Sequence, residues 1–332
     1  MTATAVRNET WTHRAARDAT RAPSVHNTQP WTIGLRPDGL DLHGDRLRKL
    51  PVLDPSGREY WLSLGAALFN ARVSSAASEV AVTVTRHPDP DDVEFVATLR
   101  RADRPLDDDE KRIATLEPYL VERHSNRRAF FPEPVAIEVV DALVRAAAAE
   151  DSLLTVVGSE EHRDIVAALV QRADREQNAN PAYRAELRQW TRHDPASRDG
   201  ISQLVVPHVD GATQDEIPIR DFDSYGLGWL PSRTESGRHQ CLLVLSTTSD
   251  DVEGWLRAGE ALERVLLEVT REGYASSLFS QPIEVPAVRN ELREALGLVT
   301  HPHLLLRIGR ASATPGTLRR PLAEVTFDAG SG

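Results

Sequence analysis

The chain has 332 residues, a length that suits two domains better than one. Its net charge of −11 argues against nucleic acid or an anionic membrane as the main partner. The single cysteine, Cys241, excludes an intramolecular disulfide and fits a reducing compartment. Residues 1–20 contain no signal-peptide-like apolar run, and the longest apolar runs elsewhere are strand-sized. We therefore expect a soluble, cytoplasmic protein.

The first part of the chain alternates between helical and strand-like patterns. Apolar periodicity and turn residues predict helices over 7–22 and 60–79, and strands over 31–35, 40–43, 80–85 and 95–100. The acidic stretch 104–110 is expected to be a solvated turn that opens the next helix.

A second cycle of helices and strands follows. The same criteria predict helices over 134–149, 159–174 and 252–273, and strands over 153–157, 240–246 and 303–309. Between them, about 190–237 is polar and broken by proline and glycine, which is typical of an active-site lid or of disorder. The aromatic residues Phe222, Tyr225 and Trp229 favour an ordered lid.

Two long helices carry a weak internal repeat. Gly65-Ala-Ala-Leu-Phe-Asn aligns with Gly259-Glu-Ala-Leu-Glu-Arg, and each glycine lies inside an otherwise helical stretch. A glycine there weakens the helix by about 1 kcal/mol relative to alanine, so a packing reason is expected. Helices that cross at these glycines would form a seam between two halves, although a chance match is an equal alternative.

The sharpest local signal is the segment Ala22–Trp31, APSVHNTQPW. It places several short polar side chains in one non-helical turn, with a proline near each end. Such a turn suits the edge of a planar heterocycle that presents carbonyl and N–H groups. An ordinary helix-to-strand loop is the alternative.

This segment resembles the Ala-Pro-Ser-x-x-Asn-x-Gln-Pro-Trp motif of the nitroreductase superfamily. The resemblance implies that the flavin ring of FMN is contacted by Pro23, Ser24, Val25 and Asn27, with Gln29 completing the cofactor-binding turn. His26 occupies a variable position, where a structural hydrogen bond is expected more than a ligand contact.

Two arginine-rich segments resemble the elements that hold the FMN phosphate in the same superfamily. The first is Arg123-His-Ser-Asn-Arg-Arg-Ala-Phe, in which Arg123 and Ser125 match the family element. An extra residue before Phe130 leaves open whether Arg127 or Arg128 takes the second arginine role. The second segment contains Arg319 and Arg320. Guanidinium groups and a hydroxyl suit a phosphate dianion.

A further segment resembles the Pro-Ile-Glu turn of these proteins, whose backbone lies against flavin N5. The resemblance assigns four residues to cofactor binding: Gln281, Pro282, Ile283 and Glu284. Val285 follows where relatives often have glycine.

The two halves of the chain carry complementary elements. The first half has the APSVHNTQPW segment but no phosphate-binding element before it. The second half has the phosphate-binding elements but no such segment. The resemblance therefore implies an α+β nitroreductase-like fold in which two fused halves, 1–115 and 116–332, form a pseudo-dimer around central helices. The sheets would be mixed and mainly antiparallel, with one FMN site per chain and a credible monomer. Within the superfamily the chain most resembles the Acg family, which shares Asp199-Gly200 and Arg220–Phe222 in the lid.

The resemblance implies an oxidoreductase that passes hydride from NADPH or NADH to the flavin and then to a nitro or quinone acceptor. No side chain is an obvious acid or base, but Arg127 or Arg128 would stabilise negative charge at flavin N1 and O2. The alternative is a protein that binds or sequesters FMN under a closed lid with little turnover, and a scaffold without flavin ranks last. No metal site is expected, because His301 and His303 lack partners at ligand spacing and suit the start of a strand.

Overall fold

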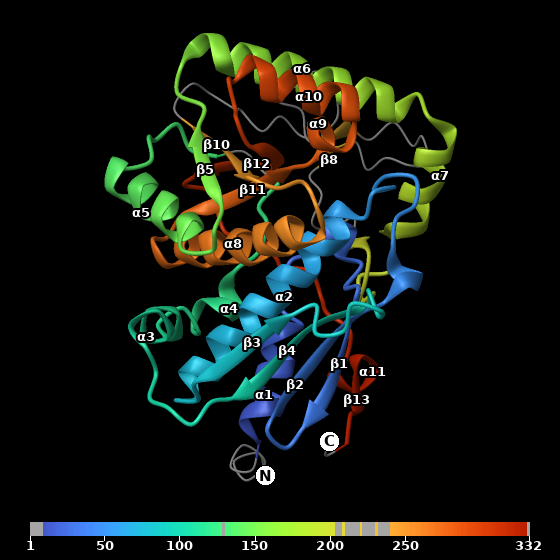
Figure 1. Cartoon of the computed structure of the whole chain (residues 1–332). Helices are drawn as coiled ribbons and strands as arrows, with labels where there is room; N and C mark the ends of the chain where they lie inside the picture. Colours follow the sequence, from blue (N-terminus) through green and yellow to red (C-terminus); the bar gives the residue numbers. More distant parts are fainter. Residues whose placement is uncertain are drawn as a thin grey trace.

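The computed structural model describes residues 9–127, 130–202, 208–209, 220, 230–231 and 240–330. Two long helices, α2 (Arg58–Ala77) and α8 (Val252–Arg271), cross in the centre, with one β-sheet on either side of them (Figure 1). Among the described residues, no helix combines the length and the apolar content needed to cross a membrane.

The N-terminal sheet has five strands in the order β13-β1-β2-β4-β3. The strands are β1 (Trp31–Arg36), β2 (Gly39–Gly44), β3 (Val82–Arg86), β4 (Phe95–Arg101) and β13 (Thr326–Asp328). All pairs are antiparallel except β13 with β1, which is parallel and brings the C-terminal segment back to this half. One apolar core joins the sheet to α2 and to α1 (Trp11–Ala19), which begins at the N-cap Thr10.

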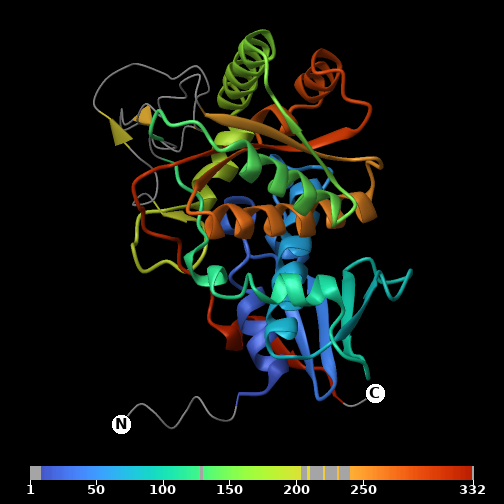
Figure 2. The same cartoon turned by 90° about the vertical axis from the view of Figure 1, so that its left-hand side faces the viewer.

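The C-terminal sheet has four antiparallel strands in the order β11-β12-β10-β5. They are β5 (Leu153–Val156), β10 (Cys241–Thr247), β11 (Ala275–Phe279) and β12 (His301–Gly309). On β10, Leu243 and Leu245 pack in a core with α8 and α5 (Ile137–Ala148). Leu242 and Val244 pack in the core of the opposite face, with α6 (Glu160–Asn178) and α10 (Pro286–Ala295). Because helices cover both faces, as Figure 2 shows from the side, the strand has consecutive apolar residues from Leu242 to Leu245.

The two central helices approach most closely at Gly65 and Gly259. A Cβ atom built on Gly65 would lie 2.0 Å from the carbonyl oxygen of Leu256, and one on Gly259 would lie 2.1 Å from that of Leu62. No real Cβ tolerates such a distance, so both positions require glycine as long as the helices keep this crossing. The predicted seam is confirmed.

The α+β class with mixed, mainly antiparallel sheets is also confirmed. The acidic stretch opens α3 (Asp108–Ala114) through a capping box formed by Asp107 and Glu110. The short helix α4 (Tyr119–Glu122) follows, and the 3-10 helices η2 (Val25–Asn27) and η3 (Arg46–Arg48) precede α2.

Several elements lie outside the predicted set. They are β11, β13, α7 (Pro181–Trp190), α9 (Gln281–Glu284), α10, α11 (Leu322–Val325) and the two-residue strands β6 (Thr191–Arg192), β7 (Ile201–Ser202), β8 (His208–Val209) and β9 (Leu230–Pro231). Most of the predicted lid, including Phe222, Tyr225 and Trp229, lies outside the described residues. The predicted start of β12 at the two histidines is confirmed, and His303 is buried and hydrogen-bonded to Thr247.

Candidate cofactor-binding site

The segment after α1 forms a tight turn that is fixed from within and from α2. The hydroxyl of Ser24 accepts a hydrogen bond from the backbone N–H of Gln29 at 3.0 Å, and the hydroxyl of Ser63 accepts one from the N–H of Val25 at 3.1 Å. His26, Asn27 and Gln29 all have positive φ, at 46°, 54° and 50°. Such backbone costs free energy for residues other than glycine, and it persists where surrounding contacts determine it. We call residues 22–31 the ring turn.

The two amide side chains of the ring turn hold other segments in place. Asn27 Nδ2 donates to the carbonyl oxygens of Gly200 and Leu318 at 3.1 and 3.2 Å. Gln29 Nε2 donates to the carbonyl of Arg198 at 2.7 Å, and its Oε1 accepts from the backbone N–H of Arg320 at 2.8 Å. The ring turn thus joins residues 198–200, in the predicted lid, to the C-terminal segment. We call residues 190–237 the insertion.

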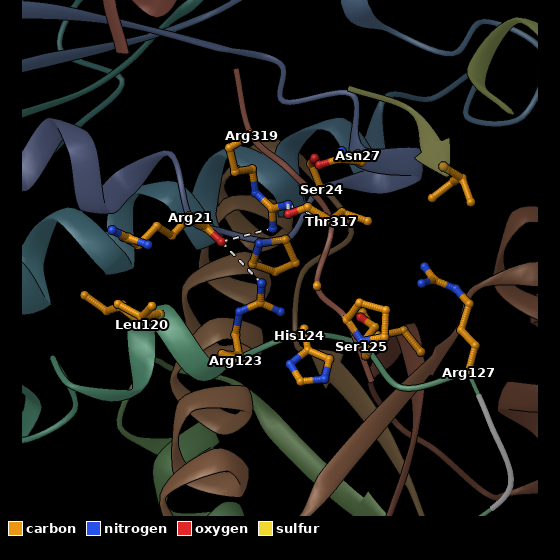
Figure 3. Close-up of a pocket in the computed structure, with 16 residues that line it drawn as sticks. Arg21, Ser24, Asn27, Leu120, Arg123, His124, Ser125, Arg127, Thr317 and Arg319 are labelled. Carbon is orange, nitrogen blue, oxygen red and sulfur yellow. Dashed lines mark hydrogen bonds between the residues drawn. The ribbon is translucent and has the colours of Figure 1, made fainter. Parts of the chain in front are cut away.

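A first cavity opens beside the ring turn and is lined by four arginines: Arg21, Arg123, Arg127 and Arg319 (Figure 3). The guanidinium groups of Arg123 and Arg319 both donate to the carbonyl oxygen of Arg21, at 3.2 and 3.1 Å. The hydroxyl-bearing residues Ser125 and Thr317 line the same cavity. The two arginine-rich segments, far apart in sequence, therefore meet in one place.

Positive charge exceeds negative charge in this first cavity. The buried Glu263 of α8 lies behind it, with its Oε1 3.3 Å from Arg123 Nε. Burial and the neighbouring Arg123 lower the pKa of Arg319 to about 9, and burial raises the pKa of Glu263 to about 7 despite Arg123. Arg319 Nε is buried and has no hydrogen-bond partner among the described residues. This donor set suits a phosphate dianion.

A second cavity adjoins the first and is more apolar. Both cavities are lined by Pro23, Ser24, Arg127 and Leu278. The wall of the second adds Val25, His26, Glu59, Leu62, Ser63, Arg220, Leu262, Ser277, Phe279, Ser280, Gln281 and Leu304. The two cavities measure about 890 and 800 Å³ when the space open to solvent at their entrances is included. A cationic cavity joined to a more apolar one fits a phosphate joined to a planar ring.

Arg127 lies at the junction of the two cavities. Burial and the nearby Arg220 lower its pKa to about 10, so it remains a cation at neutral pH. Arg128 lies outside the described residues. The position of Arg127 at both cavities is compatible with the second arginine role, which the sequence left open between Arg127 and Arg128.

Buried polar groups form a network at the second cavity. Arg220 Nη2 donates to Glu284 Oε1 at 2.5 Å and to the hydroxyl of Ser280 at 3.1 Å, and Arg220 Nη1 donates to the hydroxyl of Tyr183. Gln177 Nε2 donates to Glu284 Oε2. Burial opposes ionisation of Glu284, but Arg220 outweighs it and keeps the pKa of Glu284 below its usual value. A residue of the insertion is thus anchored in the cavity wall.

The structure brings nine of the predicted site residues to the cavity walls: Pro23, Ser24, Val25, Asn27, Arg123, Ser125, Arg127, Gln281 and Arg319. Five others do not line either cavity: Gln29, Pro282, Ile283, Glu284 and Arg320. The side chains of the Pro-Ile-Glu turn are buried behind the wall, where the carbonyl oxygen of Ile283 accepts a hydrogen bond from Arg58 Nη2. The cofactor contacts themselves stay a prediction.

Several wall residues were not predicted, including Arg21, Glu59, Ser63 and Thr317. Arg21 and Thr317 each lie two residues from a predicted one, so proximity in sequence was a usable signal. Glu59 and Ser63 are four residues apart and so lie on one face of α2. This spacing points to the site only once the ring turn is known to pack against that face.

Comparison with known proteins identifies the family. No protein-family profile matches the sequence. A protein of Mycobacterium tuberculosis with the provisional name NAD(P)H nitroreductase is 33% identical over 312 residues, which cover 92% of this chain and 88% of that protein. The Acg protein of the same organism, under the same provisional name, is 31% identical over 320 residues, covering 94% and 93%.

Solved structures of nitroreductases also align with the chain. One from Desulfitobacterium hafniense with bound FMN gives a TM-score of 0.40 and 12% identity over 62% of this chain and 95% of its own. Nitroreductase A of Vibrio parahaemolyticus gives a TM-score of 0.40 and 14% identity over 66% and 77%. The sequence relatives show that the chain belongs to the nitroreductase superfamily and, within it, to the family that includes Acg.

Proposed function

We propose that the chain is an FMN-dependent oxidoreductase that takes hydride from NADPH or NADH and passes it to a small acceptor of the nitro or quinone type. The observation that carries this proposal is the meeting of the ring turn and both arginine-rich segments around two joined cavities. The family membership supports it, since relatives are named as NAD(P)H nitroreductases.

The first cavity would hold the FMN phosphate. Arg123 and Arg319 are already aimed by their shared bond to the carbonyl of Arg21, so little side-chain entropy is lost when they bind. Ser125 and Thr317 would add hydroxyl donors. Each charge-assisted hydrogen bond to the phosphate contributes roughly 1.5–3 kcal/mol.

The second cavity would hold the flavin ring. Its apolar wall, with Leu262, Phe279 and Leu304, excludes water from the ring, and the ring turn supplies polar groups at the edge. When bound, the flavin supplies the hydride chemistry. Arg127 would stabilise the negative charge of the reduced ring, because it lies where the two cavities join.

We infer that residues 1–115 and 116–332 are two nitroreductase-like halves that form a pseudo-dimer with one site per chain. The two sheets on either side of the crossing helices support this inference. A pseudo-dimer needs no second subunit, so a monomer is expected in light-scattering measurements on the purified protein.

The direct test is the absorbance of the purified protein before and after NADPH or NADH is added without oxygen. A yellow protein that bleaches within seconds supports the oxidoreductase. A colourless protein that takes up no added FMN would refute it, and dithionite bleaching serves as the positive control for a bound flavin.

A second function is favoured by the contacts of the insertion: a closed FMN-binding protein with little turnover. Residues 198–200 are hydrogen-bonded to Asn27 and Gln29, and Arg220 is anchored to Glu284 in the cavity wall. An insertion held in this way would keep a nicotinamide from the ring. In that case the yellow protein bleaches with dithionite but not with NADPH or NADH, and removing the insertion restores bleaching.

A further inference from the structure

Two carboxyl groups, those of Glu59 on α2 and Glu284 on α9, lie together at the second cavity. Glu59 is 6% exposed and lines the cavity, whereas Glu284 is buried behind it. The two groups are within hydrogen-bonding reach of each other. Two ionised carboxylates at that separation would repel, so the contact holds a proton.

Hydrogen bonding decides which of the two carries the proton. Both oxygens of Glu284 accept from donors, Oε1 from Arg220 and Oε2 from Gln177, so Glu284 is the ionised partner. Glu59 Oε1 is buried and has no hydrogen-bond partner among the described residues. The proton therefore belongs to Glu59.

The charged groups around Glu59 support the same assignment. Burial, followed by the negative charges of Glu284 and Asp54, raises the pKa of Glu59 well above its usual value, and Arg220 offsets this only in part. Asp54 precedes α2 and accepts a hydrogen bond from the backbone N–H of Tyr60 at 2.9 Å. Glu59 therefore holds its proton to a higher pH than an ordinary glutamate does.

The other titratable groups in this wall cannot supply a proton. Arg127 and Arg220 remain cations at neutral pH. Burial and Arg220 lower the pKa of His26 to about 3, so its ring is neutral and carries no dissociable proton at physiological pH. Among the described residues that line the second cavity, Glu59 is the one carboxylic acid.

We propose that Glu59 is a catalytic proton donor to the acceptor in the second cavity. The proposal rests on the proposed function, which supplies the reductant, NADPH or NADH. A quinone becomes a hydroquinone when it gains one hydride, with two electrons, and one proton. As the acceptor oxygen gains its O–H bond, the O–H bond of Glu59 breaks and leaves a carboxylate, which takes a proton back from water.

The test is Glu59→Gln, which keeps the size of the side chain and a hydrogen-bond donor toward Glu284. The matched control is Glu79→Gln, an exposed glutamate just after the end of the same helix. Both variants are loaded with FMN and reduced with NADPH before the assay, and the control Glu79→Gln should keep FMN binding and bleaching within about twofold of wild type. Reoxidation of the reduced protein by a benzoquinone should slow about 100-fold in Glu59→Gln alone, as expected for a lost general acid.

The pH dependence gives a readout that a merely structural role would not move. In wild type, reoxidation by the quinone should slow as pH rises and Glu59 loses its proton. In Glu59→Gln the same rate should be low and independent of pH. Unchanged reoxidation in this variant, or a slow rate that keeps the pH dependence of wild type, would overturn the proposal.

Infrared spectroscopy of the flavin-free protein tests the proton without any turnover. Wild type and Glu79→Gln should show the C=O band of a protonated carboxyl well above the ordinary glutamate pKa of about 4.3. The band should be missing in Glu59→Gln, and its persistence there would place the proton elsewhere and refute the assignment. A protein that takes up no FMN would overturn the proposed function and the donor role together, while this band would still report whether Glu59 holds a proton.

Discussion

Replacing Arg319 with glutamine should weaken FMN while leaving riboflavin almost unaffected. Arg319 has one buried Nε–H without a partner among the described residues, and its other nitrogens donate to Thr317 and to the carbonyls of Arg21 and Ala22. If the free donor serves the phosphate, its loss costs roughly 1.5–3 kcal/mol of binding free energy. That cost corresponds to an increase of about 10- to 150-fold in the Kd for FMN.

The assay is titration of flavin-free protein with FMN and, separately, with riboflavin, which has the same ring but no phosphate. The ratio of the two affinities isolates the phosphate contribution, because any loss of folded protein affects both titrations equally. Arg101→Gln, at an exposed position on β4 in the N-terminal sheet, is the control and should leave both affinities unchanged. A ratio that stays at its wild-type value in Arg319→Gln would refute the assignment of the first cavity to phosphate.

Three further variants test other parts of the structure. Ser63→Ala removes the acceptor for the N–H of Val25. The binding of FMN and of riboflavin should weaken by the same factor, about 5- to 10-fold for a hydrogen bond worth about 1 kcal/mol. A loss of affinity confined to FMN would contradict this. Gly65→Ala should lower the free energy of unfolding, measured in urea, by about 1–3 kcal/mol because the added Cβ meets the carbonyl of Leu256. In the control Gly158→Ala the added Cβ meets nothing within 4 Å, so the same free energy should change by less than about 0.5 kcal/mol. Glu263 binds its proton more tightly in the folded state, with a pKa of about 7, so wild-type stability should fall as pH rises from about 4.5 to 7. With both proteins free of flavin, the free energy of unfolding of Glu263→Gln should rise by about 3 kcal/mol relative to that of wild type across this pH interval. Parallel pH profiles of the two free energies would argue against the raised pKa.

Local sequence patterns sufficed for much of the fold and for part of the site. The ring turn could be predicted because its residues are contiguous, and the arginine-rich segments because each forms a compact motif. The apolar run of β10 identified a strand, but only the structure shows that helices cover both of its faces. The glycines of the central helices pointed to a seam, since glycine inside a helix needs a packing reason.

The residues that were missed depend on contacts between distant segments. Glu59 looks like an ordinary acidic residue in the first turn of a helix, and its proposed role depends on Arg220 and Glu284, which come more than 150 residues later. The strand β13 has three residues and only one partner, β1, so no periodicity could identify it. The amide of Gln29 connects Arg198 of the insertion to Arg320 of the C-terminal segment, a link that the motif alone does not reveal.

The pairing of β13 with β1 has a consequence for the order in which the protein is made. During synthesis β1 emerges early, and its outer backbone groups have no strand partner until β13 leaves the ribosome near the end of the chain. An open strand edge of this kind is a site for aggregation. Arg319 lies only a few residues before β13, so the same late segment closes the edge and completes the arginine cluster. A chain cut short before this segment would lack Arg319 in the first cavity and would also leave the edge of β1 unpaired, so we expect cofactor binding and solubility to be lost together.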